Sequence, residues 1–475
     1  MDKTDVLIVG GSAAGLMAGL TVKRRHPGKT ITIVRKASKT PVPCGIPYIY
    51  GTLKAVEKDI IPDENFIKQG IRIHTLPVES IDRGNKTAEL ADGTRIAYDK
   101  LILATGSRPA MPPIPGMQTG NVFGIKKEPE YLAQIQKTLE ASRQVVVIGG
   151  GFIGVEMAEQ IAKMAQAGDG AGAVEVSLVE MLPNCLMLAC EQEFCMDAES
   201  ELHNLGINVL TNAQVKSIQG NGKVTGVQLA SGETIPADAV VVGIGVTPNI
   251  DLARQIGLEA DPRMGIKVDA YMQTEDPDIF AAGDCATKFS FFDGNPSGIR
   301  LASVACSEGM IAASNLYEPL RKSMGAVGAF GTTVGDTSIG AAGLTTKAAD
   351  DAHIPYVVGE AVFPNRHPGA LPGCVCDMKA KLLFHKETGR IIGGHVRGGD
   401  STADMVNIVA AAIQSGITAE ELATMQYATH PLMTASPLGY HVMLAAENAA
   451  AKMNYPAASS GVAKPRIVIN GKHAV

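Results

Sequence analysis

Two stretches of the chain share one pattern of apolar and polar positions. The first is DVLIVGGSAAGLMAGLTVKRR followed by TITIVRK, and the second is QVVVIGGGFIGVEMAEQIAKM followed by VEVSLVE. Each begins with a short apolar run, which predicts a buried strand, and passes through glycines into a longer segment that favours a helix. A second apolar strand closes each stretch. The sequence therefore predicts a βαβ nucleotide-binding unit near residues 5–36 and another near residues 144–180.

The remaining segments have other patterns. KTAELADGTRIAYDKLILATG alternates and predicts a β-hairpin that leads into a buried strand. The proline-rich GSRPAMPPIPG (106–116) cannot be a helix and is expected to cross between domains. After residue 325 the strand-like IPYVVGEAVF and KAKLLFHKETGRIIGGHV, with the helix-like ADMVNIVAAAIQSG, predict a separate α+β domain. AQAGDGAGA (165–173) is expected to be a surface loop, and the last twenty residues carry no predicted structure.

Composition narrows the class of protein. The chain has 475 residues, enough for two or three domains, and 45% of them are hydrophobic. Its formal net charge of −6 gives no electrostatic reason to expect a nucleic-acid or anionic-membrane partner. No apolar run is long enough to span a bilayer, and the N-terminus does not resemble a signal peptide. Eight cysteines without a secretory signal indicate thiols in a reducing compartment, so we expect a cytoplasmic protein.

The glycines of the second unit predict a dinucleotide site. Gly149, Gly151 and Gly154 match G-x-G-x-x-G, which lets backbone N–H groups and a helix N-terminus hold a pyrophosphate. Glu180 closes the second strand, where a carboxylate can accept both ribose hydroxyls of NAD. A 2′-phosphate would be repelled by that charge and no arginine follows immediately, so NADH is favoured over NADPH.

The first unit departs from the same motif. Gly10 and Gly15 are present, but the middle glycine is replaced by Ser12, and Arg35 stands where the acidic residue is expected. Arg35 alone would suggest a 2′-phosphate and hence NADP. A solvated strand end, or stacking on an adenine, are the alternatives.

Three further motifs complete a family resemblance. With both glycine turns, ILATGSRP (102–109), VVGIGVTPN (241–249) and IFAAGDCA (279–286) resemble, in order, segments of the two-dinucleotide-fold flavoprotein disulfide reductases. The resemblance implies an α/β protein with two Rossmann-like dinucleotide-binding domains, a C-terminal α+β dimerisation domain, and a homodimer. The expected limits are 1–116 and 250–325 for an FAD-binding domain, 117–249 for an NAD-binding domain, 326–455 for the dimerisation domain and 456–475 for a tail.

The resemblance also implies which residues bind the cofactors. In IFAAGDCA, Asp284 would bind the ribityl chain of FAD. FAD would thus occupy the first unit despite the NADP hint of Arg35, and NADH the second. For FAD we expect contacts from Gly10, Ser12, Ala13, Ala14, Gly15, Arg35, Lys36, Val78, Ala104, Thr105, Gly106, Arg108, Gly283, Asp284 and Ala302. For NADH we expect contacts from Gly149, Gly151, Phe152, Ile153, Gly154, Glu156, Glu180, Gly243 and Gly245.

The redox centre selects a branch of this family. Glutathione reductase and lipoamide dehydrogenase carry C-x-x-x-x-C here, whereas Lys39 and Ile49 leave Cys44 without a partner at that spacing. CGIPY resembles the single-cysteine branch of coenzyme A disulfide reductases, NAD(P)H sulfur and persulfide reductases, and NADH oxidases and peroxidases. The oxidases and peroxidases typically carry His at the position of Ala13. We therefore expect reduction of a sulfur–sulfur bond, with an NADH oxidase or peroxidase as the alternative.

Reaction at Cys44 requires a thiolate. We expect FAD, backbone dipoles and a helix beginning near Gly45 to lower its pKa, and thiol–disulfide exchange to give a Cys44 mixed disulfide or persulfide. Thr40-Pro41-Val42-Pro43 replaces the Ser-Phe-x-Asn stretch that helps coenzyme A disulfide reductases bind coenzyme A. Persulfide, polysulfide and elemental sulfur therefore join coenzyme A disulfide as candidate substrates. No metal is expected.

A late segment offers proton donors. QYATHPLMTASP (426–437) partly resembles the segment that the family donates across the subunit interface. Tyr427 and His430 are the candidate acid/base residues. A packed tyrosine and a helix-capping histidine are the alternatives. RHPGALPG (366–373) resembles a second segment, although Ala370 and Leu371 stand where a tyrosine is often found.

The other cysteines that stand in groups are expected to be structural. Cys185, Cys190 and Cys195 recur every five residues, about 140° apart on a helix, and fit no zinc spacing. Cys374 and Cys376 would share one strand face. We expect packing there, with a second redox pair as the alternative.

Overall fold

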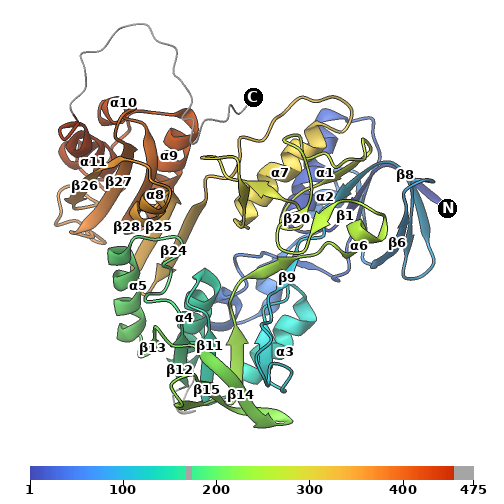
Figure 1. Ribbon diagram of the computed structural model, residues 1–475, viewed down its shortest axis with the longest axis horizontal. Coiled ribbons are helices and arrows are strands. Elements are labelled where there is room, and N and C mark those ends of the chain that lie inside the picture. The colour runs from blue at the N-terminus through green and yellow to red at the C-terminus, as the bar shows by residue number, and fades with distance from the viewer. Residues whose placement is uncertain (167–173, 454–475) are drawn as a thin grey trace, which may run out of the picture.

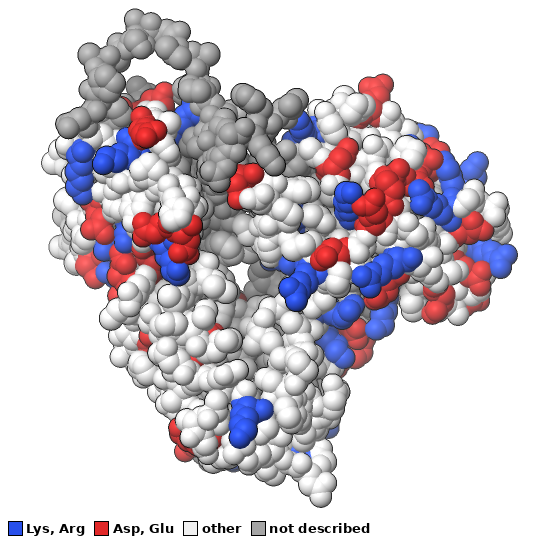
Figure 2. Space-filling model, viewed as in Figure 1, with Lys and Arg blue, Asp and Glu red and all other residues white. Residues whose placement is uncertain are grey.

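The computed structural model describes residues 1–166 and 174–453, whose strands and helices form three domains (Figure 1). Most of the predicted loop 165–173 and the whole predicted tail 456–475 therefore lie outside the described residues. Among the described residues, no helix is long and apolar enough to cross a membrane. On the face shown in Figure 2, acidic and basic side chains are interspersed, and neither sign gathers into one patch.

The first domain is built on a seven-stranded sheet with the order β5-β2-β1-β8-β7-β6, and β21 pairs with β8. Its central strands β1, β2, β5, β8 and β21 run parallel, which is the arrangement of a nucleotide-binding fold. The strands are β1 (Asp2–Val9), β2 (Ile31–Val34), β5 (Ile71–His74), β6 (Val78–Asp82), β7 (Thr87–Leu90), β8 (Arg95–Leu103) and β21 (Ile279–Ala281). The helices are α1 (Ala13–Arg25), α2 (Glu64–Ile67), α6 (Asp251–Gln255) and α7 (Ala302–Ser314).

The second domain repeats the plan on a five-stranded parallel sheet, with the order β10-β17-β11-β12-β13. A small antiparallel sheet, β14-β15-β16, is attached to it. The strands are β10 (Val122–Gly124), β11 (Gln144–Ile148), β12 (Glu175–Val179), β13 (Asn208–Leu210), β14 (Val215–Asn221), β15 (Lys223–Leu229), β16 (Thr234–Pro236) and β17 (Ala239–Val242). The helices are α3 (Pro129–Glu140), α4 (Phe152–Gln166) and α5 (Gln192–Asn204).

The third domain has a five-stranded antiparallel sheet with the order β24-β25-β28-β27-β26. The strands are β24 (Ala329–Val334), β25 (Thr337–Gly343), β26 (Tyr356–Phe363), β27 (Met378–His385) and β28 (Ile391–Gly398). The helices are α8 (Thr346–Asp351), α9 (Thr402–Ser415), α10 (Ala419–Ala423) and α11 (His441–Ala450). Buried apolar side chains of α9 and α11 join those of the sheet in one core. Two Rossmann-like domains and a C-terminal α+β domain confirm the predicted fold class.

Two short strand pairs fix segments near the candidate site. One joins the two crossings of the chain between the first and second domains, and the other closes a loop of the first domain. β9 (Ser107–Pro109) pairs antiparallel with β18 (Val246–Pro248), so the outward and returning crossings lie side by side. β3 (Thr40–Pro41) pairs with β4 (Ile60–Ile61) and closes the loop that carries Cys44. The tight packing of α7 on α1 places Ala302 and the Gly283-Asp284 turn beside the first glycine turn.

Candidate active site

The first glycine turn joins β1 to α1 and is closed by backbone contacts. Gly10 has a φ of 120°, and a Cβ there would lie 1.9 Å from the carbonyl oxygen of Ala104. A Cβ on Gly15 would lie 1.9 Å from the oxygen of Gly10. Ser12 is the N-cap of α1, but its side chain makes no capping hydrogen bond. A helix N-terminus reached through such a turn fits a pyrophosphate.

The second turn, between β11 and α4, has the same geometry. Gly149 has a φ of 104°, and a Cβ on Gly154 would lie 1.8 Å from its oxygen. Gly151 has no heavy atom within 4 Å of its Cβ position, so open space lies beside the backbone where a pyrophosphate would approach. The buried Glu180 accepts hydrogen bonds from the N–H groups of Gly150 (2.5 Å) and Leu182 (2.7 Å).

Arg35 closes the first turn from the end of β2. Its side chain is buried against Gly11, and it forms an ion pair of 2.5 Å with Asp63. Nε donates to Ala37 O, Nη1 to Thr40 and Asp63, and Nη2 to Ser38 O and Asp63. A guanidinium has five N–H donors, and all are used here. The alternative of a solvated strand end is therefore wrong, and no donor remains for a 2′-phosphate.

Other residues expected to bind FAD differ in exposure and in their contacts. Thr105 and Gly106 are tied to Asn249, whose backbone and side chain exchange hydrogen bonds with the A-T-G segment. Arg108 is exposed, and its guanidinium lies 3.3 Å from Asp251. Lys36 points outward to Glu128 of the second domain at 3.2 Å. Val78 is a half-buried residue of β6.

The residues expected to bind NADH surround the second turn. Phe152 stacks on Phe330 of the third domain, with ring centroids 5.3 Å apart. Ile153 is exposed at the start of α4. Gly243 lies against Gly154, with its Cβ position 3.2 Å from the Cα of Gly154, and Gly245 follows with a φ of 100°. Gly243 thus lets the strand end approach the turn closely.

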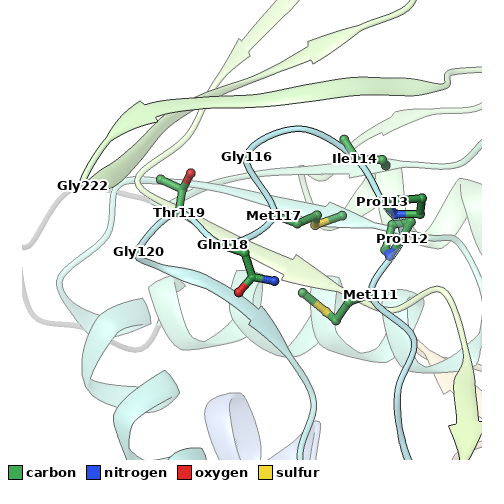
Figure 3. A pocket seen from close by; sticks show the side chains of 10 residues that line it. All are labelled: Met111, Pro112, Pro113, Ile114, Gly116, Met117, Gln118, Thr119, Gly120 and Gly222. Atoms are coloured by element: carbon green, nitrogen blue, oxygen red, sulfur yellow. The ribbon is translucent and has the colours of Figure 1, made fainter.

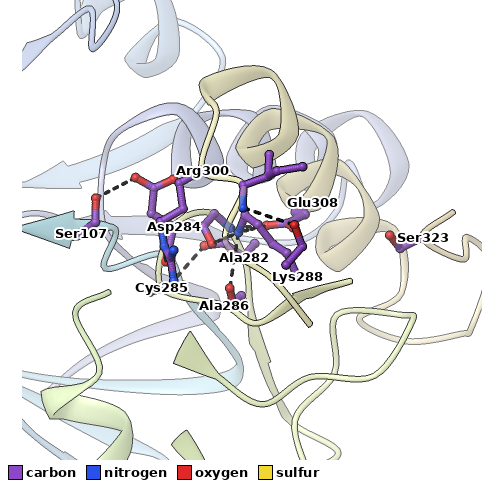
Figure 4. Close-up of polar contacts among 12 residues, drawn as sticks. Ser107, Ala282, Asp284, Cys285, Ala286, Lys288, Arg300, Glu308 and Ser323 are labelled. Carbon is purple, nitrogen blue, oxygen red and sulfur yellow. Dashed lines mark hydrogen bonds and ion pairs between the residues drawn. The ribbon is translucent and has the colours of Figure 1, made fainter. Parts of the chain in front are cut away.

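Asp284 lies at the centre of a polar network (Figure 4). Its carboxylate accepts a hydrogen bond of 2.7 Å from Ser107 and lies 3.5 Å from Lys127 Nζ. Burial alone would raise its pKa, but Lys127, the Ser107 hydroxyl, Lys288 and Arg300 outweigh burial and hold the pKa below the usual value. A carboxylate is the form that accepts hydrogen bonds from hydroxyl groups, which suits a sugar-alcohol chain.

A buried ion pair supports the Gly283-Asp284 turn from behind. Lys288 Nζ donates to Gly283 O at 2.6 Å and lies 3.0 Å from Glu308 of α7, and the same carboxylate accepts the N–H of Gly283. Figure 4 shows both side chains converging on the turn. Sequence reasoning missed Lys288 and Glu308, although a lysine and a glutamate in otherwise apolar segments were the available signal.

Cys44 is a free, exposed thiol in the turn that follows β3. The helix after it is the π-helix Ile49–Leu53, which begins beyond Gly45, so the expected helix start near Gly45 is wrong. Surrounding chain desolvates the sulfur and raises its pKa, and the charges of Glu156, Asp284 and Asp59 act in the same direction. The positive charge of Lys127 acts in the opposite direction. The chain itself therefore raises the pKa of Cys44, where the sequence led us to expect lowering.

Two carboxyl groups near Cys44 have raised pKa values. Burial raises the pKa of Glu156 on α4 to about 7, against a hydrogen bond of 2.8 Å from Thr332 of β24. Burial raises the pKa of Asp59 to about 6, and its Oδ1 lies only 1.9 Å from the Cβ position of Gly45. Asp59 was missed because nothing in its local sequence separates it from a surface residue.

Cys306 is a second thiol near this site that sequence reasoning overlooked. It lies in α7, and its sulfur is 3.7 Å from the carbonyl oxygen of Ala13. Burial raises its pKa, and a negative charge on Cys44 raises it further. Ala13, whose small side chain favoured a sulfur substrate, thus lies beside this thiol.

Tyr427 and His430 lie in the segment between α10 and α11. The hydroxyl of Tyr427 donates to Pro437 O at 2.8 Å, and its ring stacks on Tyr440 with centroids 4.3 Å apart. His430 is exposed, and its Nδ1 accepts the N–H of Leu432 in a turn rather than at a helix. Among the described residues, the side-chain hydrogen bonds of Tyr427 and His430 are made within this segment. Their acid/base roles remain predictions.

The remaining predicted cysteines divide into two groups. Cys185, Cys190 and Cys195 are free and buried, as expected, and burial raises the pKa of Cys185 and of Cys190 to about 12. Cys374 is half-buried and Cys376 exposed in the loop before β27, so the expectation of packed strand thiols is wrong for this pair.

A hollow of about 600 Å³ lies in the first crossing between the domains (Figure 3). It is lined by Met111, Pro112, Pro113, Ile114, Gly116, Met117, Gln118, Thr119, Gly120 and Gly222. It contains neither an ionisable side chain nor any residue predicted for catalysis or cofactor binding. The hollow therefore offers no side chain for acid/base or redox chemistry.

Comparisons with known proteins agree with this architecture. The pyridine nucleotide-disulphide oxidoreductase family matches residues 4–309, and its dimerisation domain matches residues 330–438. An NADH oxidase of Methanocaldococcus jannaschii is 30% identical over 94% of this chain and 99% of its own. An NAD(P)H coenzyme A polysulfide/persulfide reductase of Pyrococcus horikoshii is 29% identical over 88% of this chain and 93% of its own. The structure of an NAD-dependent persulfide reductase from A. fulgidus has a TM-score of 0.85 at 29% identity, over 94% of this chain and 83% of its own.

The two glycine turns, the Asp284 network and the free Cys44 define a flavin- and nicotinamide-dependent oxidoreductase. The chain belongs to the pyridine nucleotide-disulphide oxidoreductase family. FAD and NAD(P)H are the cofactors of this family. The first turn with Asp284 fits FAD, and the second turn with the open space beside Gly151 fits the nicotinamide dinucleotide.

Proposed function

We propose that this protein uses NADH to reduce a sulfur–sulfur bond of a small molecule, with Cys44 as the attacking thiol. The observation that carries the proposal is the placement of Cys44: it is free and exposed, within the electrostatic reach of Glu156 on the second domain and of Asp284 on the first. Persulfide, polysulfide, elemental sulfur and coenzyme A disulfide are the candidate substrates. Relatives with persulfide and polysulfide reductase names support this substrate class.

The reaction begins with exchange at sulfur. The Cys44 thiolate attacks one sulfur of the substrate, the sulfur–sulfur bond breaks, and the departing thiolate takes a proton. Cys44 then holds a mixed disulfide or persulfide. FAD, when bound, would pass two electrons from NADH to this bond, so that Cys44 would return to the thiolate and the second thiolate of the substrate would be released.

Protons at this site are held by the chain. Cys44 must lose its proton in a setting that raises its pKa, so a nearby acceptor is needed. Glu156, with a pKa of about 7, can exchange protons near neutral pH, and Lys127 is the cation that stabilises the thiolate. Tyr427 or His430 of a second subunit is the proposed donor to the leaving thiolate. That role requires a homodimer, which the dimerisation domain supports.

NADH is the proposed physiological reductant. Glu180 directly follows β12 with its carboxylate at the second turn, and Met181 and Leu182 come after it rather than an arginine. A 2′-phosphate would meet uncompensated negative charge there. All eight cysteines are free, which suits the reducing cytoplasm.

An NADH oxidase or peroxidase is the second candidate. The similarity of this chain to relatives named NADH oxidase extends over almost the whole length of those relatives. In that reaction Cys44 would carry a sulfenic acid. Ala13 provides no imidazole at the first turn to interact with such a group.

Anaerobic NADH oxidation separates the two functions. Polysulfide, coenzyme A persulfide and coenzyme A disulfide are supplied in turn, and oxygen separately, to wild type and Cys44→Ser. The substitution should lower the sulfur-dependent rate by roughly three orders of magnitude or more. Flavin content, measured in both proteins, shows that the loss is not a loss of cofactor. Sulfur reduction at the wild-type rate by Cys44→Ser would refute the proposal, and oxygen as the sole good acceptor would favour the oxidase.

A further inference from the structure

Two thiols face each other in the loop between β26 and β27, residues 364–377. The sulfur atoms of Cys374 and Cys376 are 3.9 Å apart, a distance of direct contact. Cys376 is exposed and Cys374 is half-buried, so solvent and small molecules reach the pair. Neither belongs to the Cys44 site.

The residue between them explains why they face each other. Asn365 holds Val375 from both sides: its side-chain oxygen accepts the N–H of Val375 at 2.8 Å, and its own N–H donates to Val375 O at 3.0 Å. Val375 packs against the core of the third domain. Val375 is thus turned inward, while the sulfur atoms of Cys374 and Cys376 on either side of it contact each other and Cys376 is exposed.

We propose that Cys374 and Cys376 form a second redox-active dithiol, which closes reversibly to an intrachain disulfide. This inference rests on the proposed function, because the sulfur–sulfur substrate is the oxidant and NADH the reductant. A disulfide requires the sulfur atoms to approach by about 2 Å, which side-chain rotation in an exposed loop can supply.

The exchange balances in two steps. One thiolate attacks the substrate disulfide, forms a mixed disulfide and releases one substrate thiolate. The second cysteine then attacks the first, closes the Cys374–Cys376 bond and releases the other substrate thiolate. Two protons and two electrons leave the pair, and both substrate halves become thiols. To reopen the disulfide, the Cys44 thiolate attacks one of its sulfur atoms and releases the other cysteine as a thiolate. Two electrons from NADH, passed through bound flavin, would then cleave the mixed disulfide with Cys44, and two protons from solvent would restore the thiols of the pair.

The electrostatics of the pair suit stepwise reaction. A hydrogen bond to Cys374, and repulsion from a thiolate there, raise the pKa of Cys376. Cys376 therefore holds its proton more strongly than an ordinary thiol, which suits a resolving cysteine. The Arg366 guanidinium donates to Gly373 O, next to Cys374, and brings positive charge to the loop.

The loop is attached to the segment that is expected to reach the partner's flavin. Arg366 Nη1 donates to Leu432 O at 2.7 Å, and the N–H of His367 donates to Pro431 O at 3.3 Å. The dithiol is thus fixed to the same segment as Tyr427 and His430. In a homodimer this placement would carry the pair towards the partner's Cys44, the source of its electrons.

The test measures electrons held by the pair in the holoenzyme. Wild type, the double variant Cys374→Ser/Cys376→Ser and the control Pro372→Ala, an exposed change in the same loop, are oxidised with diamide and freed of excess reagent. Each is then titrated anaerobically with NADH, and peptides are mapped before and after. Wild type and Pro372→Ala should consume one more NADH per subunit than the double variant. A Cys374–Cys376 cross-link should be present before titration and absent after it.

The inference would be overturned if no cross-link formed after diamide, or if a cross-link persisted once the flavin is reduced. Equal NADH consumption by wild type and the double variant has the same consequence. The titration needs no sulfur substrate, so it remains informative if the proposed function fails. In that case wild type would not turn over any sulfur compound, whatever the state of the pair.

Discussion

The two nucleotide turns have nearly the same backbone but are closed by side chains of opposite charge. In the first turn Arg35 packs on Gly11, with its Cδ 2.7 Å from the Cβ position of that glycine. In the second, Glu180 packs on Gly150 with its Cγ 3.0 Å from the equivalent position. Each residue directly follows the second strand of its unit. Strand-end residues of either charge can therefore perform one structural task, which is to close the glycine turn.

The difference lies in what each side chain has left to offer. All five N–H donors of Arg35 are used by Asp63, Thr40 and the carbonyl groups of Ala37 and Ser38. Within the described part of the chain, two backbone N–H groups donate to Glu180, and a carboxylate can accept about four hydrogen bonds. Glu180 can still bind ribose hydroxyls, whereas Arg35 cannot bind a phosphate. The charge of a strand-end residue indicates the ligand only when its hydrogen-bonding capacity is not already used.

Substitution of the last glycine of each turn by alanine should have the largest effect, because it should remove the cofactor of one turn and leave that of the other. A Cβ at Gly15 or Gly154 would collide with a backbone oxygen at 1.9 or 1.8 Å. We expect Gly15→Ala to be purified without flavin and Gly154→Ala to keep flavin but lose NADH affinity, each by about 4 kcal/mol or about 1,000-fold. Flavin absorbance and NADH titration measure the two effects.

Gly28→Ala is the matched control for both variants, because its Cβ position has no heavy atom within 4 Å. It should bind both cofactors as wild type does. If Gly15→Ala kept FAD but lost NADH, the assignment of the two turns would be reversed.

Removal of the Arg35 side chain tests whether this residue stabilises the fold rather than binding a cofactor phosphate. Arg35→Ala leaves Asp63 without its buried partner, so the free energy of unfolding should fall by about 3 kcal/mol. The preference for NADH over NADPH should not change. Urea denaturation measures the first effect and steady-state kinetics the second.

Lys36→Ala is the neighbouring control. Its ion pair with Glu128 is exposed, so the expected loss is below about 0.5 kcal/mol. A gain of NADPH activity in Arg35→Ala without loss of stability would show that Arg35 acts on a cofactor phosphate after all.

Neutralisation of Glu180 should have a smaller effect, on cofactor choice. Glu180→Gln removes the charge that repels a 2′-phosphate but keeps one side-chain oxygen that can accept a backbone N–H. The ratio of kcat/KM for NADH to that for NADPH should therefore fall by about tenfold. Glu175→Gln, at the exposed start of the same strand, should leave the ratio unchanged. An unaltered ratio in Glu180→Gln would assign NADH selectivity to other residues.

These variants also separate what local sequence could and could not predict. The two βαβ units, the hairpin of β7 and β8, and the α+β domain follow from apolar spacing and glycine positions, which are local properties. The partner of Arg35 does not, because Asp63 lies 28 residues away and reaches it through the β3–β4 pairing. Lys288 and Glu308 meet only when α7 packs on α1. Glycine turns can be predicted from local sequence, but the distant side chains that support these turns cannot.

The environment of the cysteines shows the same division. Cys44 was identified from its motif, but the charges that raise its pKa come from Glu156, Asp284 and Asp59, on separate elements. Cys306 reaches Ala13 from a helix 293 residues further along the chain. Spacing placed Cys374 and Cys376 on one side correctly, but it could not show that Asn365 holds them in a loop instead of a strand. The domain limits likewise remain predictions.

The helices that follow the two turns differ at one position that matters near the thiol. Two residues beyond the last glycine, α1 carries Met17 and α4 carries Glu156. Burial raises the pKa of Glu156 from 4.5 to about 7, so between these values the folded protein holds a proton that the unfolded chain has lost. The stability that this group contributes is full below about pH 4.5 and is lost as the pH rises through 7.

Glu156→Gln should therefore stabilise the protein at pH 8 relative to wild type by about 1 kcal/mol, since the side chain is only partly enclosed, and have little effect near pH 4.5. Without the carboxylate, the pKa of Cys44 should also fall, and its alkylation by iodoacetamide should begin at lower pH. Glu201→Gln is the control, because Glu201 likewise accepts a hydrogen bond from a third-domain threonine, Thr337, at 3.0 Å. Glu201 is not among the groups that shift Cys44, so its substitution should leave the alkylation profile unchanged. An unshifted alkylation profile in Glu156→Gln would show that Asp284, rather than Glu156, controls the pKa of Cys44. The difference between Met17 of α1 and Glu156 of α4 would then have no effect on the thiol.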